Sequence, residues 1–287
     1  MNIRHTLKKV KKSVSFDSDI AVFKNQYGGH QNIRYKEGVL LKPSNEREVN
    51  FYEGVADVWP SFLPFIPTYY GVNWHEEIPV INLDDLTKEF SSAAGLDVKA
   101  GVRFYDNGAH TIKRCSMMSK LYTTTSFSHG LRLTGAKVPS QFENGKPIYF
   151  LNKKSGKKLK TKNFRSTFYR FFYDGNTLRT GVLRNLLTII DRLLMVLEQG
   201  REFFMYSCSF LILYETQTED SEHPDKVSLH LIDFAHTERN VHKDRPIQTR
   251  DDDGIIFATY SLRNEVAKCI KRSEKVDWFT DPWLDLD

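Results

Sequence analysis

Two short stretches place acidic and basic side chains where they could bind a charged ligand. Lys42 ends the apolar run GVLL, and Glu48 follows it in a predicted helix. Asp97 and Lys99 alternate in GLDVKAG, so an extended chain points both side chains to the same face. Such pairs can divide labour, with the ammonium on a phosphate and the carboxylate on hydroxyl groups. Taken alone, each is also typical of a surface or cross-strand ion pair, which contributes under ~1 kcal/mol.

Asp233 poses a similar question, because it follows the predicted strand at 227–232. A carboxylate there is either a solvated turn residue or a ligand for a cation. An aspartate after a strand, followed by phenylalanine, is typical of the metal-binding aspartate of kinase-type enzymes. Mg²⁺ prefers few carboxylates together with phosphate oxygens, so one such residue can suffice. More carboxylates follow in RDDDG at 250–254, which is most simply a turn before the last helix.

The first part of the chain, from residue 20 to about 82, consists mainly of strand signals. Four runs rich in β-branched and aromatic residues predict strands, namely IAVF, IRYKEGVLLK, IPTYYGV and IPVINL. One helix interrupts them at 44–55, with Ser44 or Asn45 as its N-cap. The residues that we expect on its buried face are Val49, Tyr52 and Val55.

From residue 84 onward, long helices join the strands. AHTIKRCSMMSKLY predicts a helix with an uneven apolar side, from which we expect Ile112, Cys115 and Met118 to be buried. The strongest helix spans 178–200 and ends at Gly200. Its apolar stripe comprises Leu183, Leu186, Leu187, Ile190, Leu193, Leu194 and Leu197. Strands are predicted within 203–215 and 227–234, and a last helix near 255–271.

This order of elements predicts two lobes around a cleft, which is a common place for a ligand. The predicted parts are a mobile basic segment at 1–18, a small β-rich N-lobe at 19–83, a larger α+β C-lobe at 84–272 and an acidic-aromatic tail at 273–287. The hinge between the lobes is expected near 83–90.

Composition narrows the class of protein. The chain has 287 residues and a mild net charge of +5, with basic clusters at 8–12, 153–165 and 239–250. Each cluster is either solvated surface or a contact for an anionic ligand. Three cysteines without metal-ligand spacing fit a reducing compartment. We find neither a signal-peptide core nor a run near the ~20 apolar residues of a membrane span, so we expect a cytosolic or nuclear protein without membrane contact.

Five pieces, taken in order, resemble the inositol polyphosphate kinase family, whose pattern includes D-x-K-x-G, S-S-L-L and I-D-F. They are Lys42-Pro43 with Glu48 and Phe51-Tyr52-Glu53, then Asp97-x-Lys99-x-Gly101, SCSFLILYE, IDFAH and Asp252-x-Gly254. Within that family, YGGHQNIRY and FIPTYYGV are most similar to the inositol hexakisphosphate kinases. The resemblance covers residues 20–270.

The resemblance implies a two-lobed α+β inositol polyphosphate kinase fold with a protein-kinase-like nucleotide cleft and ATP between the lobes. In that arrangement Lys42 contacts the ATP phosphates, and Glu48 orients Lys42. Asp84 and Leu86 fall at the hinge and receive the adenine, largely through main-chain groups. Asp97 binds the ribose hydroxyls.

The catalytic residues implied by the resemblance are Lys99 and Asp233. Lys99 lies between the γ-phosphate and the inositol phosphates, and Asp233 holds Mg²⁺. The family also carries basic substrate-binding residues after D-x-K-x-G, within 103–175 of this chain. The candidates there are Arg103, Lys113, Arg114 and Lys120, of which Lys113 is the first choice.

Several positions depart from the family pattern. Gly156-Lys157 stands where the family has Y-G-R, and Ile255 and Ala258 replace the Tyr and the last Gly of D-x-G-Y-x-x-G. In the S-S-L-L segment, which is CSFL in this chain, Ser209 is kept. These departures concern the acceptor side more than the nucleotide site.

The implied activity is an ATP- and Mg²⁺-dependent phosphotransferase that converts inositol hexakisphosphate to an inositol pyrophosphate. One alternative is a kinase for hydroxyls of less phosphorylated inositols, either a trisphosphate 3-kinase or a multikinase. Another is an inactive module that binds polyphosphate or nucleic acid, although a binder needs no Asp97, Lys99 and Asp233 in kinase order. Without base-reading motifs we expect no nucleic-acid partner, and we expect a monomer. His236 is either a substrate contact or a packed, hydrogen-bonded histidine.

Overall fold

The computed structural model describes residues 20–23, 26–27, 33–139, 151–173, 178–217, 222–241 and 253–273, together with the backbone of short strands at 142–143, 146–147 and 150. The predicted mobile segment at 1–18 and the tail after 273 lie outside these residues, as do Asp252 and most of the basic cluster at 239–250.

An antiparallel five-stranded sheet forms the first lobe, with the strand order β1-β2-β3-β5-β4. Its strands are β1 (Ala21–Val22), β2 (Arg34–Lys36), β3 (Val39–Pro43), β4 (Tyr69–His75) and β5 (Ile78–Asp84). The helix α1 (Glu46–Val58) and the short η1 (Pro60–Phe65) lie between β3 and β4 in the chain. As predicted, Asn45 caps α1 by accepting the amide of Glu48, and the buried face includes Val49, Tyr52 and Val55.

The second five-stranded sheet has the order β10-β7-β6-β12-β13 and is also antiparallel. Its strands are β6 (Ala93–Ala100), β7 (Leu131–Lys137), β10 (Phe150–Leu151), β12 (Ser209–Glu215) and β13 (Val227–Ile232). Two small ladders pair β8 (Phe142–Glu143) with β9 (Lys146–Pro147), and β11 (Phe203–Met205) with β14 (Thr237–Arg239). β6 is the central strand, so residues on it have neighbours on both sides.

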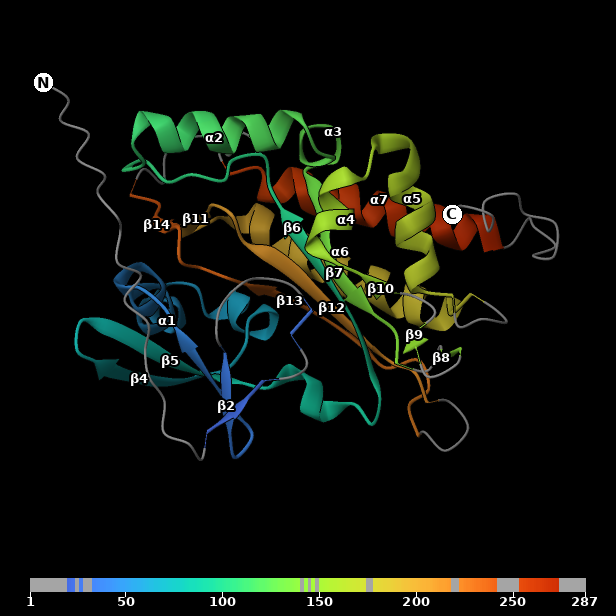
Figure 1. The fold of residues 1–287 in the computed structure, drawn as a ribbon, viewed down its shortest axis with the longest axis horizontal. Coiled ribbons are helices and arrows are strands. Elements are labelled where there is room, and N and C mark those ends of the chain that lie inside the picture. The colour runs from blue at the N-terminus through green and yellow to red at the C-terminus, as the bar shows by residue number, and fades with distance from the viewer. Residues whose placement is uncertain are drawn as a thin grey trace, which may run out of the picture.

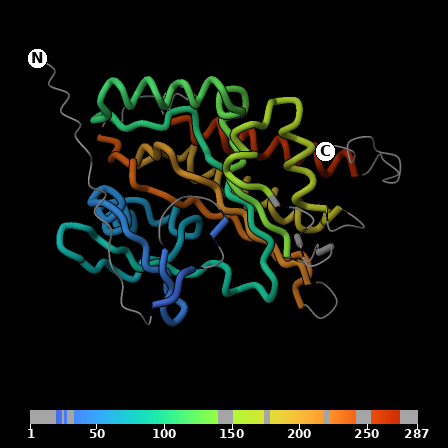
Figure 2. The backbone as a smooth tube through the Cα atoms, viewed as in Figure 1, coloured from blue at the N-terminus to red at the C-terminus, as the bar shows by residue number. Residues whose placement is uncertain are grey.

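Helices accompany the second sheet, while η2 (Leu86–Glu89) connects the two sheets. They are α2 (Thr111–Tyr122), α3 (Ser126–His129), α4 (Lys153–Lys158), α5 (Thr161–Phe171), α6 (Thr180–Gln199) and α7 (Ile255–Ser273). In Figure 1 the helices α2, α4, α5 and α7 lie above and to the right of the first lobe. In Figure 2 the blue-to-cyan N-terminal part and the green-to-red remainder form two separate masses, which confirms the two-lobed α+β architecture.

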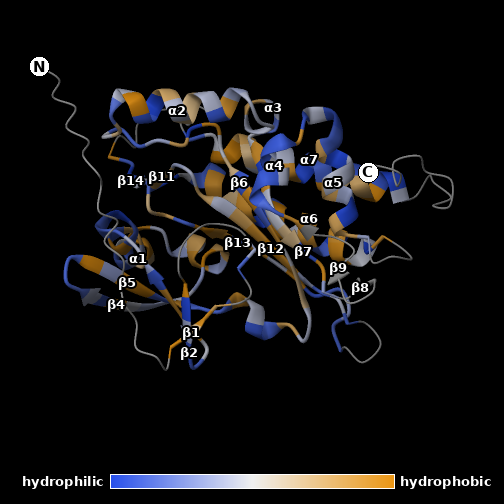
Figure 3. Cartoon of the chain, viewed as in Figure 1, coloured by the Kyte–Doolittle hydropathy of each residue, from blue (hydrophilic) through white to orange (hydrophobic). Residues whose placement is uncertain are grey.

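The core of the second lobe is built on α6. Its predicted stripe is buried apart from Leu187, which is partly buried, and Gly200 follows its last residue. α6 packs against α7 and β13. Figure 3 shows the strongly apolar residues gathered on α6 and the central strands, while α4 is largely hydrophilic.

The burial predicted for the helix at α2 is wrong. Ile112 is 86% exposed, Met118 is 39% exposed and Cys115 is also exposed. Residues three apart step back about 60° around a helix of 3.6 residues per turn, so these three share an arc of about 120°. That arc faces solvent in α2. The side turned to the protein carries Met117 and Leu121, which are only partly buried.

α4 lies very close to β7. A Cβ atom at Gly156 would lie 2.0 Å from the carbonyl oxygen of Leu133, so only glycine fits at this contact. The close approach of α4 to β7 at Gly156 fixes the position of Lys153, the first residue of α4. Among the described helices, none combines the length and the apolar character needed to cross a membrane.

Candidate active site

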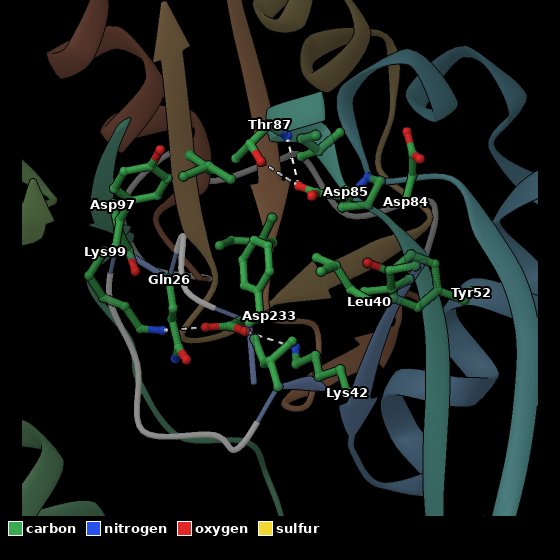
Figure 4. Close-up of a pocket in the computed structure, with 18 of the residues that line it drawn as sticks. Gln26, Leu40, Lys42, Tyr52, Asp84, Asp85, Thr87, Asp97, Lys99 and Asp233 are labelled. Atoms are coloured by element: carbon green, nitrogen blue, oxygen red, sulfur yellow. Dashed lines mark hydrogen bonds and ion pairs between the residues drawn. The ribbon is translucent and has the colours of Figure 1, made fainter. Parts of the chain in front are cut away.

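A cavity of about 360 Å³ opens between the two sheets. Figure 4 shows side chains from both sheets and from the segment that connects them pointing into it. The polar residues of its lining are Gln26, Tyr27, Lys42, Tyr52, Asp84, Asp85, Thr87, Asp97, Lys99, Lys153 and Asp233. The cavity therefore brings together six of the predicted site residues: Lys42, Asp84, Leu86, Asp97, Lys99 and Asp233.

Lys42 lies at the end of β3 and is only 4% exposed. Its Nζ donates to Oε1 of Glu48 at 2.7 Å and to Oδ1 of Asp233 at 2.8 Å. Burial alone lowers the pKa of Lys42, but the charges of Asp233 and Glu48 outweigh it and raise the pKa above its ordinary value. Lys42 is thus a cation in a buried network. It does not form the exposed ion pair with Glu48 that the sequence alone also allowed.

Glu48 links this network to the backbone of the other lobe. It is completely buried, its Oε1 accepts the amide of Phe234 at 2.9 Å, and Ser44 donates to its other oxygen. The ring of Phe234 stacks on Phe51 with centroids 4.0 Å apart. The segment that carries Asp233 is therefore fixed to α1 by both a hydrogen bond and an aromatic contact.

Asp233 directly follows β13 and has a left-handed backbone conformation, with φ of +69°. Its Oδ2 lies 4.0 Å from Nζ of Lys99, and its side chain is 35% exposed. Burial opposes ionisation, but Lys42 and Lys99 outweigh it and lower the pKa of Asp233 to about 2. This residue is an ionised carboxylate held between two lysines, not a solvated turn residue.

Asp97 and Lys99 lie two residues apart on β6 and both line the cavity, as their alternation predicts. Asp97 is 5% exposed, and its Oδ1 has no hydrogen-bond partner among the described residues. Burial and the nearby charge of Asp233 raise the pKa of Asp97, while Lys99 opposes them. A buried carboxylate oxygen without a partner is rare in native proteins, and a ligand hydroxyl would satisfy it.

Sequence reasoning missed Arg132. It lies on β7 directly opposite Lys99 in the antiparallel register, so both side chains share one face of the sheet. Arg132 is 7% exposed, and its Nε and Nη1 have no hydrogen-bond partner among the described residues. Burial lowers its pKa, although Asp97 opposes this. The available signal was a single arginine within the apolar run LRLTGA.

Lys153 adds a further cation to the cavity lining. Burial lowers the pKa of Lys153, and the charges of Lys157, Lys99 and Arg132 lower it further. These cations repel one another, so an anionic ligand among them would relieve the repulsion and supply acceptors for Arg132.

Two of the predicted substrate residues are already engaged in local structure. Nε of Arg103 donates to the carbonyl of Tyr105 at 3.0 Å, and its guanidinium lies 4.4 Å from the ring centre of Tyr206. Nε of Arg114 donates to the carbonyl of Ala109 at 2.8 Å. Both arginines stabilise the loop before α2, and neither belongs to the lining of the 360 Å³ cavity.

The other two predicted substrate residues project from α2. Lys120 approaches the sulfur of Met117 at 3.7 Å and is exposed. Lys113 is near enough to Asp106 and His236 to influence the pKa of both, but it does not line the cavity. Lys113 thus lies near Asp106 and His236, and the substrate roles of Lys113 and Lys120 remain predictions.

In the segment between the lobes, the acidic side chains form local hydrogen bonds and ion pairs. Asp84 forms an ion pair with Lys88 and accepts a hydrogen bond from Tyr70 at 3.3 Å. Asp85 accepts the amide of Thr87 at 2.9 Å, which caps η2 where Leu86 lies. The main chain here borders the cavity, and its binding of adenine remains a prediction.

Tyr27, which sequence analysis did not single out, covers the start of β6. Its hydroxyl donates to the carbonyl of Ala93 at 3.3 Å. A Cβ atom at Gly95 would lie 2.2 Å from the Tyr27 ring, so the glycine allows this close contact. The ring of Tyr27 therefore forms part of the wall of the cavity.

The donor set suits a hard divalent cation bound together with phosphate. Asp233 is ionised and partly exposed, and Ser209 lies opposite Lys99 on β12. The described residues contain no group of three or more His, Cys, Asp or Glu arranged as a metal cluster. Mg²⁺ needs no such group when one carboxylate and ligand phosphates supply its oxygens.

Comparison with known proteins identifies the family to which this chain is similar. The family model for inositol polyphosphate kinase matches residues 80–266. Inositol hexakisphosphate kinase 2 of Mus musculus is 28% identical in an alignment of 223 positions that covers 67% of this chain and 49% of that protein. Inositol hexakisphosphate kinase 3 of Homo sapiens is 29% identical in an alignment of 203 positions that covers 63% of this chain and 48% of that protein. The chain thus spans about half the length of the curated relatives it matches.

Two solved structures share the fold. Inositol phosphate multikinase Ipk2 of S. cerevisiae, in complex with ADP and Mn²⁺, matches with a TM-score of 0.66 and 26% identity, over 80% of this chain and 98% of that chain. A second inositol phosphate multikinase matches with a TM-score of 0.63 and 22% identity, over 78% of this chain and 99% of that chain. These similarities confirm the predicted two-lobed kinase fold.

Proposed function

We infer the function from one premise, which is that this chain belongs to the inositol polyphosphate kinase family. We propose that it transfers the γ-phosphoryl group of ATP to an inositol polyphosphate, with inositol hexakisphosphate as the preferred acceptor. One observation carries the proposal: Lys42, Asp97, Lys99 and Asp233 line a single cavity. The similarity to hexakisphosphate kinases over two thirds of the chain supports this choice of acceptor.

At the nucleotide end, Lys42 would bind the ATP phosphates while Glu48 holds its ammonium in place. The partnerless Oδ1 of Asp97 would accept a hydrogen bond from a ribose hydroxyl. Main-chain groups near Asp84 and Leu86 would receive the adenine. The ADP complex of the 26%-identical Ipk2 supports nucleotide binding in this cleft.

Asp233, with Ser209 nearby, would hold Mg²⁺ in this cleft. When bound, this ion would supply positive charge that neutralises the ATP phosphates. The Mn²⁺ in the Ipk2 complex supports the use of a divalent cation. Asp233 would exchange its contact with Lys42 for the metal, and Lys42 would turn to phosphate oxygens.

At the acceptor end, Lys99, Arg132 and Lys153 would neutralise the inositol phosphates. Phosphoryl transfer depends mainly on positioning and charge neutralisation, which buried cations supply well. An acceptor phosphate has a second pKa of ~6, so it is an ionised nucleophile at neutral pH and needs no general base. This chemistry suits the formation of a pyrophosphate by residues that are mostly cations.

The similarity to Ipk2 favours a second candidate, a kinase for inositol hydroxyls. Incubating the purified chain with ATP and Mg²⁺, and with inositol hexakisphosphate or inositol trisphosphate in parallel, separates the two. Phosphorus NMR of the products should show a new pyrophosphate from the hexakisphosphate, and Asp233→Asn should remove it. Product from the trisphosphate alone would establish the hydroxyl kinase instead. No product from either acceptor, from a folded chain, would overturn the proposed activity.

A further inference from the structure

Next to the first turn of α1 lies a second cavity of about 410 Å³, whose lining includes Arg47, Asp106 and His236. His236 belongs to the turn between β13 and β14, three residues after Asp233. Its Nδ1 lies 2.8 Å from Oδ2 of Asp106, and Nη1 of Arg47 lies 3.0 Å from the same oxygen. Asp106 is therefore the point where α1 of one lobe meets a histidine beside the candidate active site.

Asp106 is well suited to fix the ring of His236. It is 6% exposed, which opposes its ionisation, but the hydrogen bond with His236 and the charge of Arg47 outweigh burial and lower the pKa of Asp106. An ionised carboxylate only accepts hydrogen bonds, so Nδ1 of His236 must carry the hydrogen. Nε2 is then the atom at which a second proton binds.

The charges around His236 come from several elements. They are Glu46 and Arg47 of α1, Glu77 of the β4–β5 turn, Lys99 of β6, Asp106 of the following loop, Lys113 of α2 and Glu238 of β14. Burial has the largest influence on His236, and with Lys113 and Lys99 it outweighs the hydrogen bond to Asp106 and lowers the pKa of His236.

A polyanion bound beside Lys99 and Lys113 changes this balance. It neutralises the two lysines that disfavour the imidazolium, and it offers phosphate oxygens that accept hydrogen bonds from it. Asp106 stabilises the same cation from the other side of the ring, as a carboxylate does for any histidine that becomes charged. An acceptor phosphate and Asp106 would then hold the imidazolium between them.

We propose that Asp106 is a positioning residue through which acceptor binding adds one proton, drawn from solvent, to Nε2 of His236. The inference rests on the proposed function, because it takes an inositol polyphosphate as the bound anion. Arg47 keeps Asp106 in place, so the proton-accepting histidine is tied to the helix that also carries Glu48. His236 gains a charge-assisted hydrogen bond to the acceptor, and the acceptor binds more tightly at lower pH.

Isothermal titration calorimetry of inositol hexakisphosphate into the full chain without nucleotide tests this. Near neutral pH, in two buffers of different ionisation enthalpy, the buffer dependence of the heat gives the net proton uptake. We expect the wild type to take up about one proton more than His236→Gln and Asp106→Asn. We expect both variants to bind the acceptor about tenfold more weakly, which is the loss of one charge-assisted hydrogen bond.

Glu238→Gln is the matched control, because Glu238 pairs with Arg47 and Asn107 but forms no hydrogen bond or ion pair with His236. It should keep the proton uptake of the wild type. A merely structural Asp106 would weaken binding without changing the uptake, so equal uptake in all four proteins overturns the inference while the proposed function stands. If Asp106→Asn does not fold, Arg47→Gln takes its place, because it removes the partner that holds Asp106, and it should lose part of the proton uptake. No binding by the folded wild type overturns both proposals.

Discussion

Nζ of Lys42 on β3 lies 2.8 Å from Oδ1 of Asp233, which follows the last strand of the second sheet. These residues are 191 positions apart in the chain, yet this ion pair joins the two lobes across the cavity. The same ammonium is held by Glu48, whose other contacts reach Ser44 and the amide of Phe234. Cleft geometry therefore depends on one buried carboxylate of α1.

Removing the charge of Glu48 tests this dependence. In Glu48→Gln, Lys42 loses its charged partner and the amide of Phe234 loses a strong acceptor. We expect the KM for ATP to rise and kcat to fall by about tenfold each, which corresponds to one charge-assisted hydrogen bond in each term. Initial rates at varied ATP concentration measure this. Asp57→Asn, at an exposed position of the same helix, should behave as wild type, and unchanged constants in Glu48→Gln would contradict the role of Glu48.

Lys99 should be essential to turnover. Lys99→Ala removes the cation that lies between the Asp233 carboxylate and the side chain of Arg132 on the neighbouring strand. Loss of one preorganised charge in a closed site costs at least about 10²-fold in kcat, and nucleotide binding should survive in part because Lys42 remains. Single-turnover rates under saturating ATP are the measurement, with the exposed Lys162→Ala as control. Near-normal turnover by Lys99→Ala would refute the assigned role.

Arg132 and Lys113 should differ in their response to salt. Lys113 is exposed on α2, so Lys113→Ala should raise the acceptor KM at low salt and lose this effect near ~1 M, where the screening length is about 3 Å. Arg132 is buried, so Arg132→Met should raise the acceptor KM by about tenfold or more at every salt concentration. If Lys113→Ala has the same acceptor KM as the wild type at every salt concentration, Lys113 does not belong to the site. Equal salt responses of both variants would contradict the buried placement of Arg132.

Asp97 should lower the stability of the ligand-free protein. Its pKa is raised by burial, so the ionised form is disfavoured in the folded state. At neutral pH the free energy of unfolding is therefore reduced by the full cost of burying an ionised Asp97. This cost disappears as pH falls below the pKa of ~3.9 that Asp97 has in the unfolded chain. Asp97→Asn should therefore raise Tm near pH 7 by about 2–4 °C, for a gain of about 1 kcal/mol, while weakening ATP binding.

Thermal unfolding of the wild type and Asp97→Asn at several pH values provides the check. The advantage of the variant should shrink toward acid pH, because Asp97 is then neutral in both states. A variant that is less stable than wild type at neutral pH would show that the carboxylate of Asp97 is a stabilising partner in the folded chain.

The residues that sequence predicts well are those carried by short local motifs. Lys42, Asp97, Lys99 and Asp233 each lie in or directly after a strand that its own residues specify, so their side-chain directions follow from alternation. Arg132 could not be placed this way, because its importance comes from the register that pairs β7 with β6. Pairing between distant strands is a property of the folded sheet, and the sequence of one strand does not specify which strand pairs with it.

Long helices show the same distinction. The stripe of α6 repeats at both three- and four-residue spacing, so it specifies one buried face and the prediction is confirmed. The apolar residues of α2 are spread more widely, because Met117 and Leu121 lie beside Ile112, Cys115 and Met118 around the helix, and the expected burial of the latter three is wrong. Asp106 and His236 are 130 positions apart, so their contact was also beyond reach of any local pattern.

The contact between Gly156 and Leu133 also limits how this protein can be re-engineered. Even one methyl group at position 156 would push α4 off β7 and displace Lys153 from the lining of the cavity. A library intended to alter acceptor choice should therefore keep Gly156 invariant and diversify the exposed lysines beside it, such as Lys154 and Lys157. Sequence variation along this segment is restricted at the one position that has no side chain to vary.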